Sequence, residues 1–253
     1  MNKNKVLGFM CLYYGRDFLR ESLLSVKNHI DKMHISYTRT PSQGFGTNIP
    51  CPDKEQELRK IAKKVLGDKL IWKSYNGFGQ ESEHRNTRYK YSDKYKLILT
   101  IDADEVFKEE DIDTVLEYAS KNKERYYGIT GYINFWRSFS WYCTDDFRPI
   151  RVENVTVKNQ LQNLNNCKME VYHFSTCQRE EIMRFKYKIF GHADELRKNY
   201  LDSVYYAWTP ETKDIITHLH PTTTGIWGTA LPFDKTTLPS YLKEHPNYTK
   251  ELV

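Results

Sequence analysis

Between Tyr95 and Phe107 the chain reads Tyr-Lys-Leu-Ile-Leu-Thr-Ile-Asp-Ala-Asp-Glu-Val-Phe, an apolar run that ends abruptly in carboxylates. Four of the five residues from 97 to 101 are apolar, without the alternation of a half-exposed strand. This pattern is typical of a strand covered on both faces, as in a parallel α/β sheet. Packing gives no reason for three carboxylates to follow within four residues. Like charges this close raise one another's pKa unless a cation or strong donors neutralise them.

The carboxylates of Asp102 and Asp104 are candidate ligands for Mn²⁺ or Mg²⁺, because hard divalent cations prefer oxygen ligands. In open α/β sheets, ligands bind at the carboxyl ends of the strands, where these residues are predicted to lie. The alternative interpretation is a solvated acidic turn that precedes a helix beginning near Glu109.

The composition indicates a globular enzyme-sized chain rather than a membrane or disulfide-rich protein. Its 253 residues can bury a substantial core. The five cysteines show no CxxC pairing, so we expect free thiols and no zinc site. Apolar runs are too short for a membrane span, and we expect a soluble, cytoplasmic protein. The net charge of +5 permits a polyanionic partner without requiring one.

The first half of the chain predicts alternating strands and helices. Strands are expected at 6–13, 34–38, 69–75 and 95–101. The intervening helices begin at Asp17 and Asp53, whose side chains are placed to cap them, and near Gln80. Gly67 is expected to end the second helix. This βαβαβαβ order predicts a doubly wound sheet, since crossovers between parallel strands are right-handed.

The second half changes to a mixed pattern. A helix is predicted at 109–121, strands at 126–135, 148–157 and 169–174, and a further helix at 178–190. A short helix is possible at 238–243. We predict one domain over residues 1–205, with residues 206–253 as a tail packed on it.

Two groups of motifs flank the central stretch. Gly77-Phe-Gly-Gln80 and Arg85-Asn86 precede it, and Val171-Tyr-His-Phe-Ser175 follows, with Glu180-Glu-Ile-Met-Arg184 and Lys188 further on. Together with Asp-Ala-Asp-Glu, these motifs resemble nucleotide-sugar glycosyltransferases of the GT-A fold, of the family-two type, such as lipopolysaccharide-core glucosyltransferases. The resemblance covers about residues 6–190. It implies a Rossmann-like, mixed but mainly parallel sheet flanked by helices.

The resemblance also implies a donor site. It places Asp102, Asp104 and His173 on a metal ion, which would bridge the two phosphates of a nucleotide-sugar, expected to be a UDP-sugar. Tyr13, Tyr14 and Arg16 would contact the base and ribose, and Arg85 the sugar or a phosphate oxygen. The other positions implied at the donor are Thr38, Gly77, Asn86 and Ala103.

The chain departs from the family pattern in two places. The second strand ends in Ser36-Tyr37-Thr38, where acidic residues that hold the base or ribose are usual. The position of the catalytic base is also open: Asp146 is ranked first because of the aromatic residues before it, and Asp145 and Asp194 are the other candidates. A base must lie within hydrogen-bond reach of the acceptor hydroxyl.

Several functions remain open. The preferred acceptor is a glycan hydroxyl, and the alternative is a hydroxymethylated pyrimidine in phage-type DNA, flipped out of the helix. A phosphatase of the haloacid dehalogenase type also has an Asp-x-Asp after a strand, although normally after the first one. A non-catalytic protein that binds a nucleotide-sugar or glycan is the third class of answer. The oligomeric state is left open.

Overall fold

The computed structural model of the chain describes residues 5–42, 50–158, 165–189, 191, 193–223 and 225–253. The strands are β1 (Val6–Leu12), β2 (Lys32–Thr38), β3 (Leu70–Tyr75), β4 (Leu97–Thr100), β5 (Glu105–Phe107), β6 (Tyr126–Phe135), β7 (Trp141–Thr144), β8 (Ile150–Asn154), β9 (Asn165–His173) and β10 (Leu231–Pro232). The helices are α1 (Leu19–Val26), α2 (Glu55–Leu66), α3 (Glu81–Asn86), α4 (Glu109–Lys121), α5 (Glu180–Ile189) and α6 (Ser240–Lys243), with a 3₁₀ helix η2 (Thr87–Tyr91) directly after α3.

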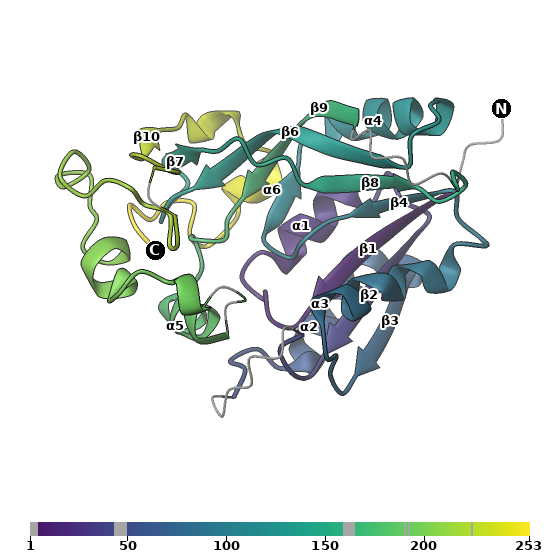
Figure 1. Cartoon of the computed structure of the whole chain (residues 1–253), viewed down its shortest axis with the longest axis horizontal. Coiled ribbons are helices and arrows are strands. Elements are labelled where there is room, and N and C mark those ends of the chain that lie inside the picture. The colour runs from purple at the N-terminus through teal and green to yellow at the C-terminus, as the bar shows by residue number, and fades with distance from the viewer. Residues whose placement is uncertain (1–4, 43–49, 159–164, 190, 192, 224) are drawn as a thin grey trace.

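One mixed sheet of ten strands runs through the molecule (Figure 1). Its path is β10-β7-β6-β8-β4-β1-β2-β3, and β9 pairs with both β6 and β5. The strands β4, β1, β2 and β3 are mutually parallel, whereas β8 joins β4 in antiparallel orientation. The predicted α/β architecture, a Rossmann-like sheet flanked by helices, is confirmed.

Both faces of the central strands are covered. Leu97 and Leu99 of β4 pack in a core with the helices α1, α2 and α4, while Ile98 packs on the opposite face with Leu7, Phe9 and residues of η2. Consecutive side chains of a strand point to opposite faces, so an apolar run without alternation is what two covered faces require. The central stretch was therefore interpreted correctly as a buried strand.

The predicted helix caps are wrong at two positions. α1 begins at Leu19 and α2 at Glu55, and neither has a capping side chain among the described residues. The carboxylates of Asp17 and Asp53, which were expected to cap them, instead bind Arg179. A capping box does occur at α3, between Gln80 and Glu83, and the predicted helix there is split into α3 and η2. The prediction that α2 ends at Gly67 is confirmed, since this residue has φ +56°.

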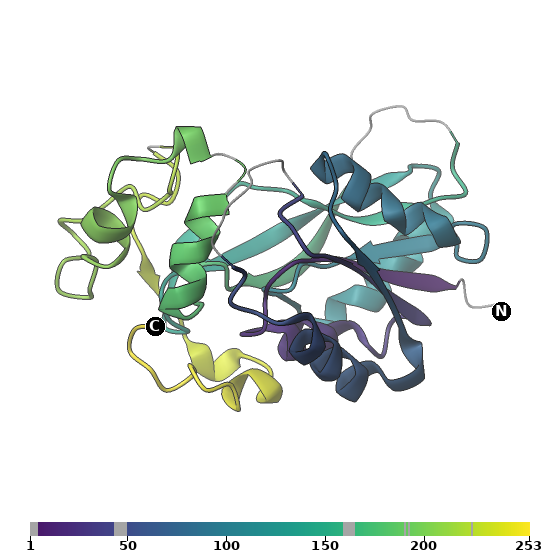
Figure 2. The same ribbon diagram turned by 90° about the horizontal axis from the view of Figure 1, so that it is seen from below.

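The C-terminal half adds two further cores. α5 contributes Met183 and Tyr187 to a cluster with residues 200–230, and Leu238 and Leu242 from the end of the chain pack with Phe18 and Phe174. Figure 2 shows these C-terminal segments gathered at one end of the molecule: α5 lies between the light-green segment that follows it and the parallel strands, whereas α6 packs on Phe18, directly before α1. The strands β5, β7 and β10 were not predicted. The end of the predicted helix at Phe190 lies outside the described residues, and the boundary at residue 205 stays a prediction.

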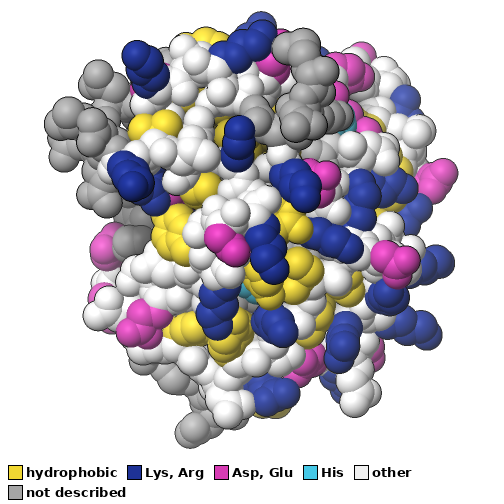
Figure 3. Space-filling view, turned by 90° about the vertical axis from the view of Figure 1, so that its right-hand side faces the viewer, with side chains coloured by type: hydrophobic (Ala, Val, Ile, Leu, Met, Phe, Trp, Pro, Cys, Tyr) yellow, Lys and Arg dark blue, Asp and Glu magenta, His cyan; other side chains and the backbone are white. Residues whose placement is uncertain are grey.

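The other end of the molecule is basic. Lys5, Lys32, Lys69 and Lys96 stand directly before, or at, the first residue of β1, β2, β3 and β4. Figure 3 shows this end, where many Lys and Arg side chains surround hydrophobic ones. Among the helices of the described ranges, none combines the length and the apolar character needed to cross a membrane.

Candidate functional site

A cavity of about 370 Å³ opens at the carboxyl ends of β1 and β4. Parallel strands place their carboxyl ends on one edge of the sheet, which is where ligands bind in such folds. The lining residues come from the end of β1 and the loop after it, the loop after β2, α3, the Asp-Ala-Asp segment, the end of β9 and the segment around α5. They are Cys11, Leu12, Tyr13, Tyr14, Gly15, Pro41, Ser42, His84, Arg85, Asp102, Ala103, Asp104, His173, Gln178, Lys186, Ile189 and Gly191.

Backbone contacts fix the Asp-Ala-Asp segment at this edge. The Ser22 hydroxyl of α1 donates to the carbonyl oxygen of Asp102 at 2.9 Å, and the N–H of Glu105 donates to the same oxygen at 3.1 Å. The N–H of Phe174 donates to the carbonyl oxygen of Asp104 at 2.8 Å. The turn is therefore held between the first helix and the end of β9.

The loop after β1 approaches this segment closely at Gly15. Its φ is +137°, and a Cβ added there would lie 2.6 Å from the Cβ of Ala103. Residues with side chains rarely adopt this φ, and non-bonded carbon atoms do not pack at that distance. Glycine at position 15 thus permits the loop to lie against the Asp-Ala-Asp turn.

The pairing of β5 with β9 brings His173 into the site. His173 lies opposite Glu105 in this antiparallel pair, and its Nε2 is 3.8 Å from Asp104 Oδ1. Its Nδ1 is 2.7 Å from Asn134 Oδ1, whose amide nitrogen faces Asp145 at 3.4 Å. Because the amide oxygen can only accept, Nδ1 carries the hydrogen and Nε2 keeps its lone pair. Burial lowers the pKa of His173 to about 4, which favours the neutral ring.

The carboxylate of Asp104 has two further neighbours, both from the segment around α5. Gln178 donates through its amide nitrogen to Asp104 Oδ2 at 3.1 Å, and the ammonium of Lys186 lies 3.7 Å from the same oxygen. Lys186 also donates to the carbonyl oxygen of Ser175 at 3.1 Å. The cavity therefore has a cationic group from α5 beside the candidate ligand.

The carboxylate of Asp102 belongs to a buried ionic network. Arg151 donates to Asp102 Oδ2 at 2.9 Å and also binds Glu105, which in turn accepts from the Tyr132 hydroxyl. Burial alone would raise the pKa of Asp102, but Arg151 and Arg85 outweigh it and hold that pKa below its usual range. Burial raises the pKa of Glu105 to about 7. Arg151 thus compensates the charge of two neighbouring carboxylates.

The side chains at this edge meet some of the needs of a divalent ion. Asp104 and His173 fit, because carboxylate oxygen and neutral imidazole both suit Mn²⁺, and a ligating histidine commonly donates its other N–H to an acceptor such as Asn134. Asp102 is directed to Arg151. In the part of the chain that the structure describes, no three His, Cys, Asp or Glu side chains are grouped as a complete metal site. Any ion held here needs ligands from the substrate or water as well.

The structure gathers seven of the residues that the sequence placed at the donor or metal. They are Tyr13, Tyr14, Arg85, Asp102, Ala103, Asp104 and His173.

The other predicted residues lie outside the described lining of the cavity. Arg16 binds Glu57, and the Thr38 hydroxyl donates to the carbonyl oxygen of Thr40. Gly77 packs against Thr40, and Asn86 is exposed. Among the candidate bases, Asp145 accepts from Trp227 Nε1 at 2.9 Å, while Asp146 and Asp194 are exposed. The roles assigned to these residues stay predictions.

Sequence reasoning missed Gln178 and Lys186. Lys186 lies in the last turn of α5. Its proximity to Asp104 depends on how α5 packs, which the local sequence does not encode.

The fold and the cavity together define an α/β protein of Rossmann-like architecture with an acidic and basic ligand site at the carboxyl edge of its sheet. No protein-family model and no curated protein matches the chain. Among solved structures, the fold is similar to the crystal structure of S. aureus TarS 1–349, with 11% sequence identity and a TM-score of 0.41. The similarity covers 60% of this chain and 47% of that one, less than half of its length.

Proposed function

We propose that the chain is a glycosyltransferase that moves a sugar from a nucleotide-sugar, most simply a UDP-sugar, to a hydroxyl of a glycan. The observation that carries this proposal is the composition of the cavity. It combines a carboxylate–imidazole pair, Asp104 and His173, with the cations Arg85 and Lys186 and two tyrosine rings. A nucleotide-sugar has the complementary parts: a diphosphate, an aromatic base and a polar sugar.

The diphosphate would lie between the ion ligands and the cations. Asp104 and His173, with Asp102 beside them, would hold Mn²⁺ or Mg²⁺, which commonly binds through one or two carboxylates plus substrate phosphates. When bound, such an ion stabilises the negative charge that develops on a departing diphosphate. Arg85, whose guanidinium also binds Glu81 of α3, would donate its remaining N–H groups to phosphate oxygens, and Lys186 adds a compact point charge.

The base and ribose would contact the loop after β1. Tyr13 and Tyr14 line the cavity, and both rings contact Phe185 of α5, with centroid distances of 5.8 and 5.9 Å. Aromatic rings with a polar edge suit a nucleoside, because they can stack on it and hydrogen-bond with it. In this proposal the small side chain of Ala103 lets the backbone approach the ligand closely. The assignment of four further residues to the donor rests only on the sequence motifs: Arg16, Thr38, Gly77 and Asn86.

Transfer to the acceptor hydroxyl requires a catalytic base, and the candidate carboxylates differ in their exposure and in the hydrogen bonds that they already make. Both carboxylate oxygens of Asp145 accept hydrogen bonds, from Trp227 and from the N–H of Phe147 at 2.8 Å. Asp146 is exposed and makes no hydrogen bond with any described residue. We retain Asp146 as the first candidate and Asp145 and Asp194 as the others. Substitution of each by Asn, with kcat measured, distinguishes them.

Two acceptors are considered, the glycan and hydroxymethylated DNA. The basic face in Figure 3 supplies the positive charge that a DNA backbone would need. That face stands at the amino ends of the parallel strands, whereas the cavity stands at their carboxyl ends. DNA bound at that face would not by itself bring a hydroxymethylated pyrimidine into the cavity beside Asp104. We therefore place the glycan first.

The test has two stages. Thermal-shift titrations with UDP, GDP, CMP and dTDP in Mn²⁺ report donor choice, since a ligand of the native state raises its apparent stability. We expect UDP to give the largest shift; a larger one from GDP or dTDP would overturn the choice of base. Labelled UDP-sugar is then offered with oligosaccharides, unmodified DNA and hydroxymethylcytosine-containing DNA. Label entering only the hydroxymethylated DNA would refute the glycan acceptor.

The same samples separate the other classes of function. Release of inorganic phosphate from a phosphomonoester, without nucleotide release from a UDP-sugar, would indicate the phosphatase. Nucleotide binding without turnover on any acceptor would indicate the non-catalytic binder.

A further inference from the structure

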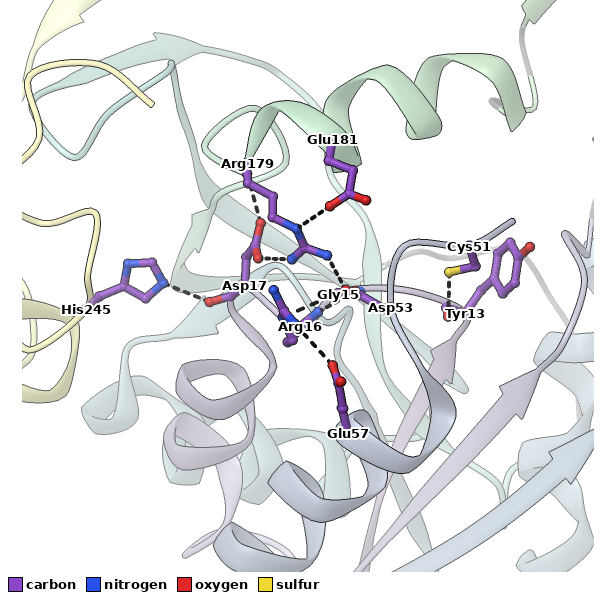
Figure 4. Close-up of polar contacts among 10 residues, drawn as sticks. All are labelled: Tyr13, Gly15, Arg16, Asp17, Cys51, Asp53, Glu57, Arg179, Glu181 and His245. Atoms are coloured by element: carbon purple, nitrogen blue, oxygen red, sulfur yellow. Dashed lines mark hydrogen bonds and ion pairs between the residues drawn. The ribbon is translucent and has the colours of Figure 1, made fainter. Parts of the chain in front are cut away.

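Arg179, at the start of α5, joins two loops that are far from it in the sequence (Figure 4). Its guanidinium binds the carboxylates of Asp17 and Asp53. Its backbone N–H donates to the second oxygen of Asp17 at 2.8 Å. Arginine presents several N–H donors in a rigid fork, so it can hold two carboxylates at once, which the single ammonium of lysine does less well.

Asp53 connects Arg179 to the loop after β1 at a second place, Gly15 and Arg16. Its side chain has no solvent exposure, and one of its oxygens accepts from the N–H groups of Gly15 and Arg16, at 2.8 Å each. The other oxygen binds Arg179. A buried carboxylate needs such compensation, because an unpaired charge in the interior is costly. We name the set Arg179, Asp17 and Asp53 the Arg179 clamp.

The clamp joins the two walls of the cavity. One wall is the loop that carries Tyr13, Tyr14 and Gly15, and the other is α5, which carries Lys186 and Ile189. Phe185 of α5 contacts both tyrosine rings, so the walls also touch through apolar groups. The ionic contact lies directly before α5 and the apolar contact lies within it, six positions further on, so the helix is held to the loop at two separate points.

The start of α5 also sets the place of Lys186. Arg179 directly precedes α5, and Lys186 lies in the last turn of this helix. The ammonium of Lys186 lies 3.7 Å from Asp104 Oδ2. α5 therefore has the clamp at its beginning and, near its end, the cation that faces the candidate metal ligand Asp104. A shift of the first turn would move this cation.

We propose that Arg179 is a positioning residue for nucleotide binding: the clamp holds α5 against the loop after β1, so that Lys186 and the two tyrosines face a nucleoside diphosphate at a fixed spacing. This inference rests on the proposed function for the identity of the ligand. The holding of α5 itself does not depend on that identity. Loss of the clamp lowers the fraction of molecules with a formed cavity, and apparent affinity falls by that fraction.

The experiment compares Arg179→Lys, Asp17→Asn and Arg179→Met with Arg20→Met as a matched control. Arg20 also makes two ion pairs, with Glu21 and Glu244, but lies outside the cavity lining. Arg179→Lys and Asp17→Asn are the informative variants if Arg179→Met does not fold, because they leave Asp53 with a cationic neighbour. Three quantities are measured for each: the Kd for UDP with Mn²⁺, the amide hydrogen exchange of residues 180–189, and KM and kcat with a UDP-sugar.

We expect Arg179→Lys and Asp17→Asn to weaken UDP binding and raise the donor KM by about tenfold, with kcat changed by less than about threefold. Exchange in α5 should accelerate, and Arg20→Met should leave all three quantities unchanged. Unchanged UDP affinity in the two variants, despite lower thermal stability, would overturn the proposal and leave a purely structural ion pair.

A failure of the proposed function gives a different result. If the unsubstituted protein binds none of UDP, GDP, CMP and dTDP, the glycosyltransferase proposal fails. Hydrogen exchange then decides the clamp alone: faster exchange of residues 180–189 in Arg179→Lys than in Arg20→Met supports it, and equal exchange refutes it.

Discussion

The imidazole Nε2 of His173 lies 3.8 Å from the carboxylate of Asp104, although 69 positions separate the two residues in the chain (173 minus 104). The pairing of β5 with β9 creates this contact, because it aligns Glu105, the neighbour of Asp104, with His173. The metal ligands proposed here thus come from the two strands of one ladder.

Asp104→Ala should reduce nucleotide release from a UDP-sugar by at least about 100-fold, or ~2.7 kcal/mol, because it removes a charged ligand of the proposed ion, which would stabilise the leaving diphosphate. The melting temperature should change little, since the side chain faces the cavity. Asp113→Ala, on the exposed side of α4, is the control and should keep full turnover. Full turnover by Asp104→Ala, or by the unsubstituted protein in excess chelator, would contradict the metal mechanism.

Asn134→Leu should weaken activation by Mn²⁺ by about 10- to 100-fold, the usual effect of losing the partner that orients a ligating histidine. The substitution removes the oxygen that accepts from His173 Nδ1 but keeps the size of the side chain. The measurement is the Mn²⁺ concentration for half-maximal activity. An unchanged value, with the fold intact by circular dichroism, would assign Asn134 a packing role only.

His34 should make the protein less stable in acid. The ring is buried between Phe9 and Tyr91, and neither nitrogen has a hydrogen-bond partner among the described residues. Burial, together with Lys90 and Lys73, lowers the pKa of His34 to about 4. As the pH falls, the unfolded chain therefore takes up a proton at His34 before the folded protein does. The free energy of unfolding decreases between about pH 6.5 and 4, by up to roughly 3 kcal/mol.

The measurement is urea unfolding of the protein and of His34→Phe between pH 4 and 7. The phenyl ring keeps the aromatic packing and cannot titrate. The stability difference between the two proteins should therefore change with pH across this window. A constant difference would show that His34 does not contribute to the pH dependence of stability.

Gly15→Ala should destabilise the fold by about 1–3 kcal/mol from backbone strain, with an added cost from the clash with Ala103. Gly225→Ala is the control, because Gly225 also has positive φ, at +96°, but no described atom lies within 4 Å of the place that an added methyl group would take. Adding Ala103→Gly to Gly15→Ala should restore the stability lost to the clash, while the loss from backbone strain should remain. Chemical unfolding of these variants tests this; equal stabilities of Gly15→Ala with and without Ala103→Gly would disprove the clash.

The sequence predicts the parallel strands and most helices because their apolar patterns are local. It fails at Asp17 and Asp53, where capping propensity is overridden by a distant arginine, as happens at strained or functional sites. The carboxylate edge of the sheet was identified from Asp102 and Asp104 alone. Lys186, Gln178 and the link from Asn134 to His173 could not be found, because they depend on the packing of α5 and on the register of β6 against β9.

The contact between Gly15 and Ala103 also limits how this protein can vary. Ala103 is not a proposed metal ligand, but a glycine on another strand's loop occupies the space beyond its methyl group. A larger residue at position 103 would need the loop after β1 to retreat, and that loop carries the tyrosines of the cavity. We therefore expect relatives that share the loop to keep a small residue between the two aspartates, and relatives with a larger one to differ at both sites together.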